Sequence, residues 1–309
     1  MKRSAWRYGI VGLALLCLLG PATTHATGSP GDAGALFLRI GMGARAAGMG
    51  EAYTAVAEDA SSAYWNPAAM AAVLGTNAML MHNEYIQSVR LEQITLTHET
   101  DYGTIGIGFS GLYMDELDRY EDIPSSQPLG TFPVYDVAVS VGFSRYIFPD
   151  VAIGAAVKPV YEKIDDQSAK GVAFDLGIYH VSRIPGVKFA AVLANLGAPI
   201  KFVEQDFALP RVIKVGGSFE RDIPAARGGI LVAVDVLFPN DGDVKEHVGF
   251  EYNYDQRLFL RSGFKAGYES YGSTFGLGVA YRNLTLDYGL MLMSNDLGDS
   301  HRVSLGFSL

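Results

Sequence analysis

Apolar and polar residues alternate along most of this chain, from about residue 77 to its last position. Within 103–113, for example, Ile105, Ile107 and Phe109 share one face, and glycine or serine occupies the positions between and after them. A period of two residues is that of a β-strand, because successive side chains of a strand point to opposite faces of the sheet. The pattern predicts 14 strands, at residues 77–87, 90–100, 103–113, 134–146, 150–163, 170–181, 186–196, 210–221, 228–237, 245–254, 257–266, 273–281, 284–293 and 300–309.

The lengths of these strands and of their connections predict an all-β fold, a 14-stranded antiparallel transmembrane β-barrel. Most strands have about 9–13 residues, which is what a tilted strand needs to cross a bilayer. Short connections, as at 101–102 and 282–283, alternate with longer ones at 114–133, 197–209 and 294–299. Such a rhythm is expected when one rim of a barrel faces the periplasm and the other faces outward. A soluble β-sandwich could share the apolar fraction of 49%, but it has no reason to keep this rhythm.

The first 26 residues have the features of a secretory signal peptide. Lys2, Arg3 and Arg7 precede the short apolar run 10–19, and small residues follow up to Ala26. Removing residues 1–26 removes three positive charges, which takes the net charge from −9 to about −12. The only cysteine is also removed, and no basic stripe that would indicate nucleic-acid binding remains. We therefore expect export to the outer membrane of a diderm bacterium, in contact with outer-membrane lipid.

Charged residues stand opposite the apolar face of several strands and are expected to face the barrel lumen. In lipid such charges would cost several kcal/mol at the middle of the membrane, whereas inside the barrel they can pair. They are either a structural ion network, which we favour, or the lining of a transport pathway. The expected lumen charges are Asp136, Lys158, Asp175, Glu251, Arg261 and Asp287. Aromatic girdles are expected from Tyr146, Phe148, Tyr161, Tyr179, Tyr254 and Tyr281.

Residues 27–76 do not alternate and are expected to form a hatch that fills the lumen of the barrel, which comprises residues 77–309. Asn66-Pro67-Ala68 predicts the start of a short helix, with Asn66 as its N-cap and Pro67 at its first position. Glycines suit tight turns and the close approach of one backbone to another. The expected hatch motif comprises Gly41, Gly43, Arg45, Gly48, Gly50, Asp59, Asn66, Pro67 and Ala68.

This motif, from Gly41 to Ala68, resembles the start of the PorV/PorQ family of outer-membrane proteins, within the wider group of barrels similar to FadL. The resemblance covers about 30 residues and implies a 14-stranded barrel closed by an N-terminal hatch. The chain departs from the family in its short loops and in its last residue, Leu309, where many such barrels end in an aromatic residue.

The resemblance implies a PorV-like component of the type IX secretion system as the first functional hypothesis. Such a component binds the C-terminal signal domains of secreted proteins and passes them to the machinery of surface attachment. Its partners would be secreted cargo proteins or secretion-system components, in contact with the loops 114–133, 197–209 and 294–299.

The alternative is a FadL-like channel for hydrophobic small molecules. Asn66-Pro67 would then be the hinge of a mobile hatch, and Phe37, Leu38, Met42 and Met49 would line an apolar pocket for a lipophilic ligand. The five histidines outside the signal peptide show no metal-ligand spacing. We therefore expect no catalytic residue, no bound metal and no cofactor, and hence no enzyme.

Overall fold

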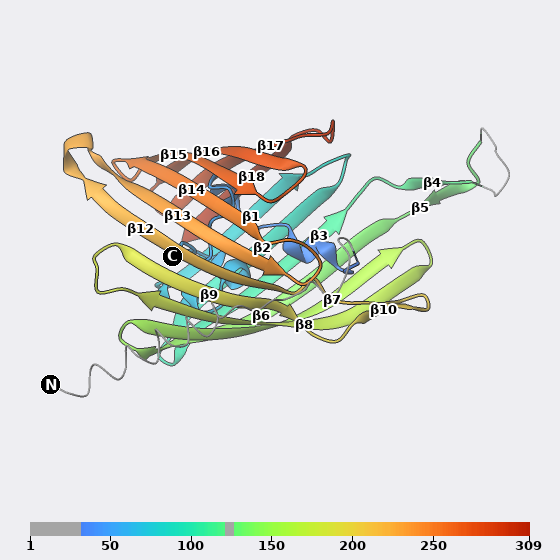
Figure 1. Ribbon diagram of the computed structural model, residues 1–309, viewed down its shortest axis with the longest axis horizontal. Coiled ribbons are helices and arrows are strands. Elements are labelled where there is room, and N and C mark those ends of the chain that lie inside the picture. The colour runs from blue at the N-terminus through green and yellow to red at the C-terminus, as the bar shows by residue number, and fades with distance from the viewer. Residues whose placement is uncertain (1–31, 121–126) are drawn as a thin grey trace.

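The computed structural model describes residues 32–120 and 127–309, so the expected signal peptide lies outside the described residues. Fourteen strands close into an antiparallel barrel, which confirms the predicted fold class (Figure 1). Each barrel strand pairs with the barrel strand that follows it in the chain, and β1 pairs with β18 to close the barrel. The barrel strands are β1 Thr76–Glu84, β2 Arg90–Thr100, β3 Gly103–Tyr113, β6 Val134–Phe148, β7 Val151–Ile164, β8 Gln167–Val181, β9 Val187–Leu196, β12 Val212–Ile223, β13 Gly228–Pro239, β14 Lys245–Tyr254, β15 Leu258–Ala266, β16 Tyr271–Tyr281, β17 Leu284–Met293 and β18 Ser300–Ser308.

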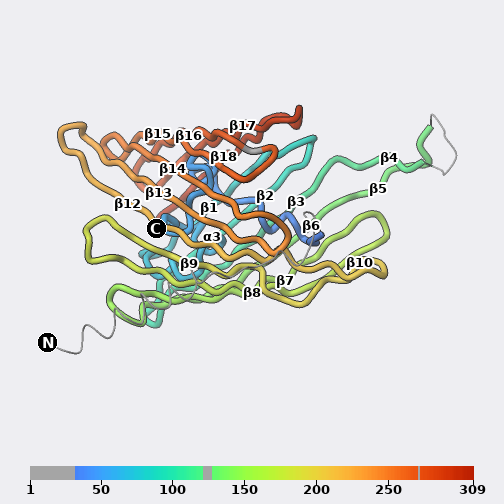
Figure 2. The backbone as a smooth tube through the Cα atoms, in the orientation of Figure 1, coloured from blue at the N-terminus to red at the C-terminus, as the bar shows by residue number. Residues whose placement is uncertain are grey.

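The two ends of the barrel differ, and we name them the short-turn end and the long-loop end. The start of β1 and the C-terminus lie together at the short-turn end, where Leu309 and Thr76 exchange backbone hydrogen bonds of 2.8 and 3.3 Å. Two small hairpins lie at the long-loop end: β4 Leu117–Arg119 with β5 Gly130–Phe132, and β10 Ile200–Phe202 with β11 Gln205–Phe207. The β4–β5 hairpin projects from this end, as Figure 2 shows, while β10 packs against β8. The β7–β8 turn at 165–166 also lies at this end, although it has only two residues.

Apolar side chains cover the outside of the barrel. Ile107 and Leu277, for example, are 47% and 56% exposed, while the residues beside them in sequence face inward. A continuous apolar belt of this kind on a closed barrel suits lipid and not water. Tyr146, Tyr254 and Tyr281 lie on the outside near the short-turn end, as the girdle prediction requires. Tyr179 does not, because it shares the inward face of β8 with Asp175 and is fully buried.

Residues 32–75 fill the lumen and form four short helical elements, visible in blue within the barrel (Figure 1). We call this segment the hatch. Its elements are η1 Leu36–Arg39, α2 Ala44–Gly48, α3 Ser62–Trp65 and η2 Ala69–Ala72. Among residues 32–120 and 127–309, no helix is long and apolar enough to cross a membrane.

The helix predicted after Asn66 is a single 3₁₀ turn, η2, and not an α-helix. The Asn66 side-chain oxygen accepts a hydrogen bond from the Ala68 amide at 3.0 Å, as an N-cap would. Its amide nitrogen donates to the carbonyl of Thr54 at 3.2 Å, a contact within the hatch. The Asn66 side chain is thus used on both sides to hold neighbouring backbone.

Glycine allows the hatch backbone to approach the barrel wall closely. A Cβ at Gly276 on β16 would lie 3.0 Å from the Cα of Gly48, so both positions lack room for a side chain. Gly50 follows with a φ of 63°, in the left-handed region that favours glycine. The small residues of the motif therefore set how tightly α2 packs against the wall.

Candidate functional site

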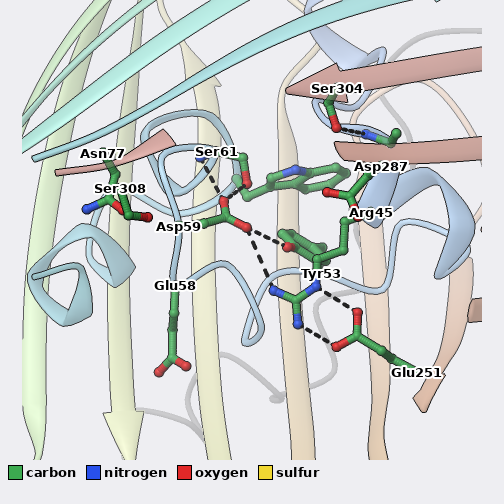
Figure 3. Close-up of polar contacts among 12 residues, drawn as sticks. Arg45, Tyr53, Glu58, Asp59, Ser61, Asn77, Glu251, Asp287, Ser304 and Ser308 are labelled. Atoms are coloured by element: carbon green, nitrogen blue, oxygen red, sulfur yellow. Dashed lines mark hydrogen bonds and ion pairs between the residues drawn. The ribbon is translucent and has the colours of Figure 1, made fainter. Parts of the chain in front are cut away.

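An ion cluster joins the hatch to the barrel wall toward the short-turn end (Figure 3). The Arg45 guanidinium in α2 donates two hydrogen bonds to the Glu251 carboxylate on β14, each of 2.8 Å. Glu251 also accepts from Arg261 at 2.5 Å, and Arg261 donates to Asp287 at 2.7 Å. The bidentate pairing of Arg45 with Glu251 fixes the orientation of the guanidinium as well as its position. The Asp59 carboxylate lies on the other side of the Arg45 guanidinium, with 3.8 Å between Asp59 Oδ2 and Arg45 Nη1.

A second cluster surrounds Glu51, the residue that follows Gly50 in the hatch. Its carboxylate pairs with Lys265 at 2.5 Å and with Arg302 at 2.8 Å, and all three side chains are almost completely buried. Burial alone raises the pKa of Glu51, but Lys265 and Arg302 lower it well below the usual range of a glutamate. Arg302 also donates to the carbonyl of Gly41 at 2.9 Å. An ion-pair cluster at Glu51 and a hydrogen bond at Gly41 thus attach both ends of the segment 41–51 to the wall.

Two further carboxylates of the wall accept hydrogen bonds from backbone amides, and one of them also pairs with a cation. Asp235 on β13 accepts from the amides of Tyr53 and Thr54, each at 2.9 Å, and thereby caps a turn of the hatch. Asp175 on β8 pairs with Lys158 at 2.8 Å and accepts from the amide of Asn195 at 2.8 Å.

The wall is irregular at Asp175. The register of β8 and β9 shifts there, between the pairs Phe174–Leu196 and Leu176–Leu193. Beyond this shift, residues 167–173 of β8 have no partner on β9, and the β10–β11 hairpin lies beside them. The β8–β9 ladder thus ends at the Phe174–Leu196 pair, before β8 reaches its long-loop end.

A cavity of about 250 Å³ lies inside the barrel toward the long-loop end, and we call it the outer cavity. Leu36, Leu38 and Ile40 of the hatch form part of its wall, together with aromatic side chains and several cationic ones from the barrel. Glu51 and Trp65 also face it. The lining is thus apolar and aromatic with a surplus of positive charge.

A smaller inner cavity of about 180 Å³ lies on the opposite side of the hatch, toward the short-turn end. Arg45, Asp59 and Phe259 are among its lining residues. The two cavities are separated by the packed interior of the hatch. Trp65, which lines the outer cavity, packs against Tyr53 with ring centroids 5.7 Å apart, and Tyr53 donates to Asp59 at 2.9 Å.

The structure places most of the expected lumen charges in these clusters. Glu251, Arg261 and Asp287 lie in the first cluster, while Lys158 and Asp175 form a separate pair. Asp136 takes no part: it is half-buried on β6, across from Glu162 on the neighbouring strand. Of the residues expected to line an apolar pocket, Leu38 does so, while Phe37, Met42 and Met49 are buried in hydrophobic clusters between the hatch and the barrel wall.

Three important residues are missing from the sequence-based set: Glu51, Arg302 and Lys214. Glu51 follows the glycine motif directly, and Arg302 and Lys214 occupy inward positions of alternating strands, so the strand pattern carried a signal for both. Within the described part of the chain, no group of three histidine, cysteine, aspartate or glutamate residues could hold a metal ion.

Solved outer-membrane barrels have the same fold. The toluene transporter TodX of Pseudomonas putida matches with a TM-score of 0.61 and 13% identity, over 87% of this chain and 99% of that one. A deltaS2 mutant of the TodX monoaromatic hydrocarbon channel matches with a TM-score of 0.56 and 11% identity, over 86% of this chain and 96% of that one. No curated protein sequence matches significantly.

The family model that matches is that of the "Uncharacterised protein family (UPF0164)", over residues 22–205. This match takes in the whole hatch and the first seven barrel strands. The resemblance to PorV/PorQ stays a hypothesis beside it. Because the match covers more than half of the sequence, the chain belongs to the UPF0164 family.

Proposed function

We propose that this protein is an outer-membrane channel for hydrophobic small molecules, with its long-loop end outside and its short-turn end in the periplasm. The observation that carries the proposal is the pair of cavities on opposite sides of the hatch, inside one closed barrel. A purely structural barrel has no need of an apolar, aromatic cavity within reach of the outside. The shared fold of TodX, a toluene transporter, supports the same function.

The proposed route begins in the outer cavity and ends in the inner one. The hatch blocks it in this conformation, because Trp65, Tyr53 and Asp59 are in contact from one cavity to the other. Transport therefore requires a local movement of the hatch, while the ion pairs of Arg45 and Glu51 limit how far it moves. The wall at Asp175, where the β8–β9 ladder shifts register and then ends, offers a lateral entrance or exit beside the outer cavity.

A reversible block of the outer cavity tests this function. Leu36 lines the cavity and is 45% exposed, so Leu36→Cys can be modified from outside with a bulky methanethiosulfonate reagent. Cys17 lies in the expected signal peptide and does not interfere. We expect uptake of radiolabelled toluene by cells that produce the protein to fall after modification and to recover after reduction.

Leu129→Cys is the matched control, because Leu129 is 62% exposed and lies beside the β4–β5 hairpin, away from the cavity. Its modification should leave uptake unchanged. Uptake that equals that of cells without the protein, or that ignores the modification at residue 36, would refute the channel function.

A PorV-like role in type IX secretion is the second candidate. The observation that favours it is the β4–β5 hairpin, which projects far beyond the barrel rim and could contact a protein (Figure 1). Photo-crosslinking from Ser294→Cys and Leu129→Cys in cells, followed by mass spectrometry, would then capture secreted proteins through their C-terminal domains. A lack of protein adducts above the level of an unlabelled control would reject this candidate.

A further inference from the structure

We propose that the outer cavity binds compact aromatic anions, such as an arene carboxylate, with Lys214 as the binding site for the acidic group. The inference rests on the proposed channel function and names the chemical class of its ligand. Three features carry it: the one lining lysine or arginine that makes no hydrogen bond or ion pair within the described residues, the aromatic lining, and the size of the cavity.

Lys214 differs from the other cations of the outer cavity in its partners. Within the described ranges, its ammonium makes no hydrogen bond or ion pair and instead lies over the rings of Trp65 and Tyr64, at 4.8 and 5.8 Å from their centroids. The other lining cations are engaged with protein oxygens: Arg39 with Asp241, Lys158 with Asp175, Lys245 with the Gly267 carbonyl, and Lys265 and Arg302 with Glu51. An anion in the cavity would therefore find its free partner at Lys214.

The surroundings of Lys214 strengthen its attraction for an anion. Six cationic residues line the outer cavity but only two acidic ones, Glu51 and Asp175, and both of these are already paired. In a partly enclosed, apolar site this surplus of positive charge is screened less than at an open surface. The cavity thus favours an anion over a neutral compound of equal size.

The aromatic lining favours a flat ring next to the acidic group. Tyr64, Trp65, Tyr85 and Tyr268 all line the cavity. Aromatic rings gain about 0.5–1.5 kcal/mol per pair beyond the burial of their area when they stack or meet edge to face. The ring of the ligand would therefore pack beside Trp65, while the carboxylate of the ligand pairs with the Lys214 ammonium over the Trp65 ring.

The volume limits the ligand to a small molecule. At about 20–30 Å³ per non-hydrogen atom, the scale of a water molecule in the liquid, a cavity of 250 Å³ holds about 8 to 12 such atoms. Benzoate fits within this limit, whereas a long-chain fatty acid does not. The acidic group of the ligand distinguishes the proposed site from one for neutral hydrocarbons. The small volume of the cavity distinguishes it from a site for long acyl chains.

Binding of benzoate, toluene and hexadecanoate to the purified, folded protein tests the proposal. Trp65 reports ligand in the cavity by fluorescence quenching, because the second tryptophan of the sequence, Trp6, lies in the expected signal peptide. We expect benzoate to bind at least tenfold more tightly than toluene, and more tightly than hexadecanoate. Lys214→Met should abolish the preference for benzoate over toluene, whereas Lys214→Arg should retain most of it.

Lys201→Met, which removes an exposed lysine on β10 outside the cavity lining, is the matched control and should bind as the parent does. Equal affinity for benzoate and toluene, or an unchanged preference in Lys214→Met, would overturn the inference while toluene uptake through the cavity still supported the channel. Tighter binding of hexadecanoate would overturn the limit on size. If none of the three compounds binds and toluene uptake is absent, the proposed function itself fails.

Discussion

The pair between Arg45 and Glu251 should control how readily the hatch leaves the barrel wall. Replacing Arg45 with methionine removes two charge-assisted hydrogen bonds but keeps much of the length and apolar packing of the side chain. A hydrogen bond to a charged group contributes about 1.5–3 kcal/mol net. The Arg45 side chain is 25% exposed, so screening by water reduces this contribution.

The variant does not leave a buried charge without a partner, which would cost about 3–5 kcal/mol. Glu251 keeps Arg261 at 2.5 Å, and Arg261 keeps Asp287 at 2.7 Å. We therefore expect the free energy of opening the hatch to fall by about 2 kcal/mol, which corresponds to an increase of about 30-fold in the open population.

Native-state hydrogen exchange followed by mass spectrometry measures this opening. The amides of 44–50 should exchange about 30-fold faster in Arg45→Met, while the barrel strands keep their protection. Arg227→Met, which removes an exposed ion pair with Asp255 at the short-turn end, should change exchange little. Unchanged exchange at 44–50 would refute the reasoning, as would equal acceleration throughout the barrel, because the ion pair would then not act on the hatch.

Three further predictions follow from the lumen contacts. Lys158→Met leaves the Asp175 carboxylate, which is 2% exposed, with only its hydrogen bond from the Asn195 amide. This variant should lower the free energy of unfolding by about 3 kcal/mol, measured by urea titration in detergent. Adding Asp175→Asn should restore part of the lost stability. Gly263→Ala would place a methyl group against the backbone of Gly50, and should speed exchange at 44–50 as Arg45→Met does; a hatch as protected as in the parent would contradict this close approach. The pKa of Glu51 is lowered in the folded protein, so its ion pairs should stabilise the hatch fully above the ordinary pKa of about 4.5 and less as the pH falls below that value. Amide hydrogen exchange of residues 44–50, followed between pH 3 and 7, measures this change. Glu51→Gln should remove this pH dependence.

The alternation of residues predicted the strands correctly because it is a local property of each segment. Every strand has one side in contact with the apolar exterior, so Ile107 and Phe109 reveal the outer face without knowledge of their neighbours. The same logic places Asp175 and Glu251 inside. The prediction of Tyr179 as an outward girdle residue was wrong, because Tyr179 is four residues from Asp175 and therefore lies on the same inward face.

The hatch was harder to predict, because its conformation depends on the wall around it. Asn66 has the sequence signature of an N-cap, yet the contacts of its amide to Thr54 and Ala68 leave only a 3₁₀ turn after it. Met42 and Met49 look like pocket residues in the sequence, and the packing of the hatch buries them. Short helical elements without a core of their own take their structure from the surface against which they pack.

The sequence by itself determined the closed antiparallel barrel, the number of strands, the faces of most charges and the presence of a segment that fills the lumen. The tertiary structure alone decided which charges pair, since Arg45 and Glu251 are 206 residues apart and Lys265 and Glu51 are 214 apart. A difference of one residue in strand register would exchange the partners of such pairs and turn every side chain of a strand to the other face. The structure also decided that Lys214 lies over two aromatic rings, because that contact forms only when β12 and the hatch are brought together inside the barrel.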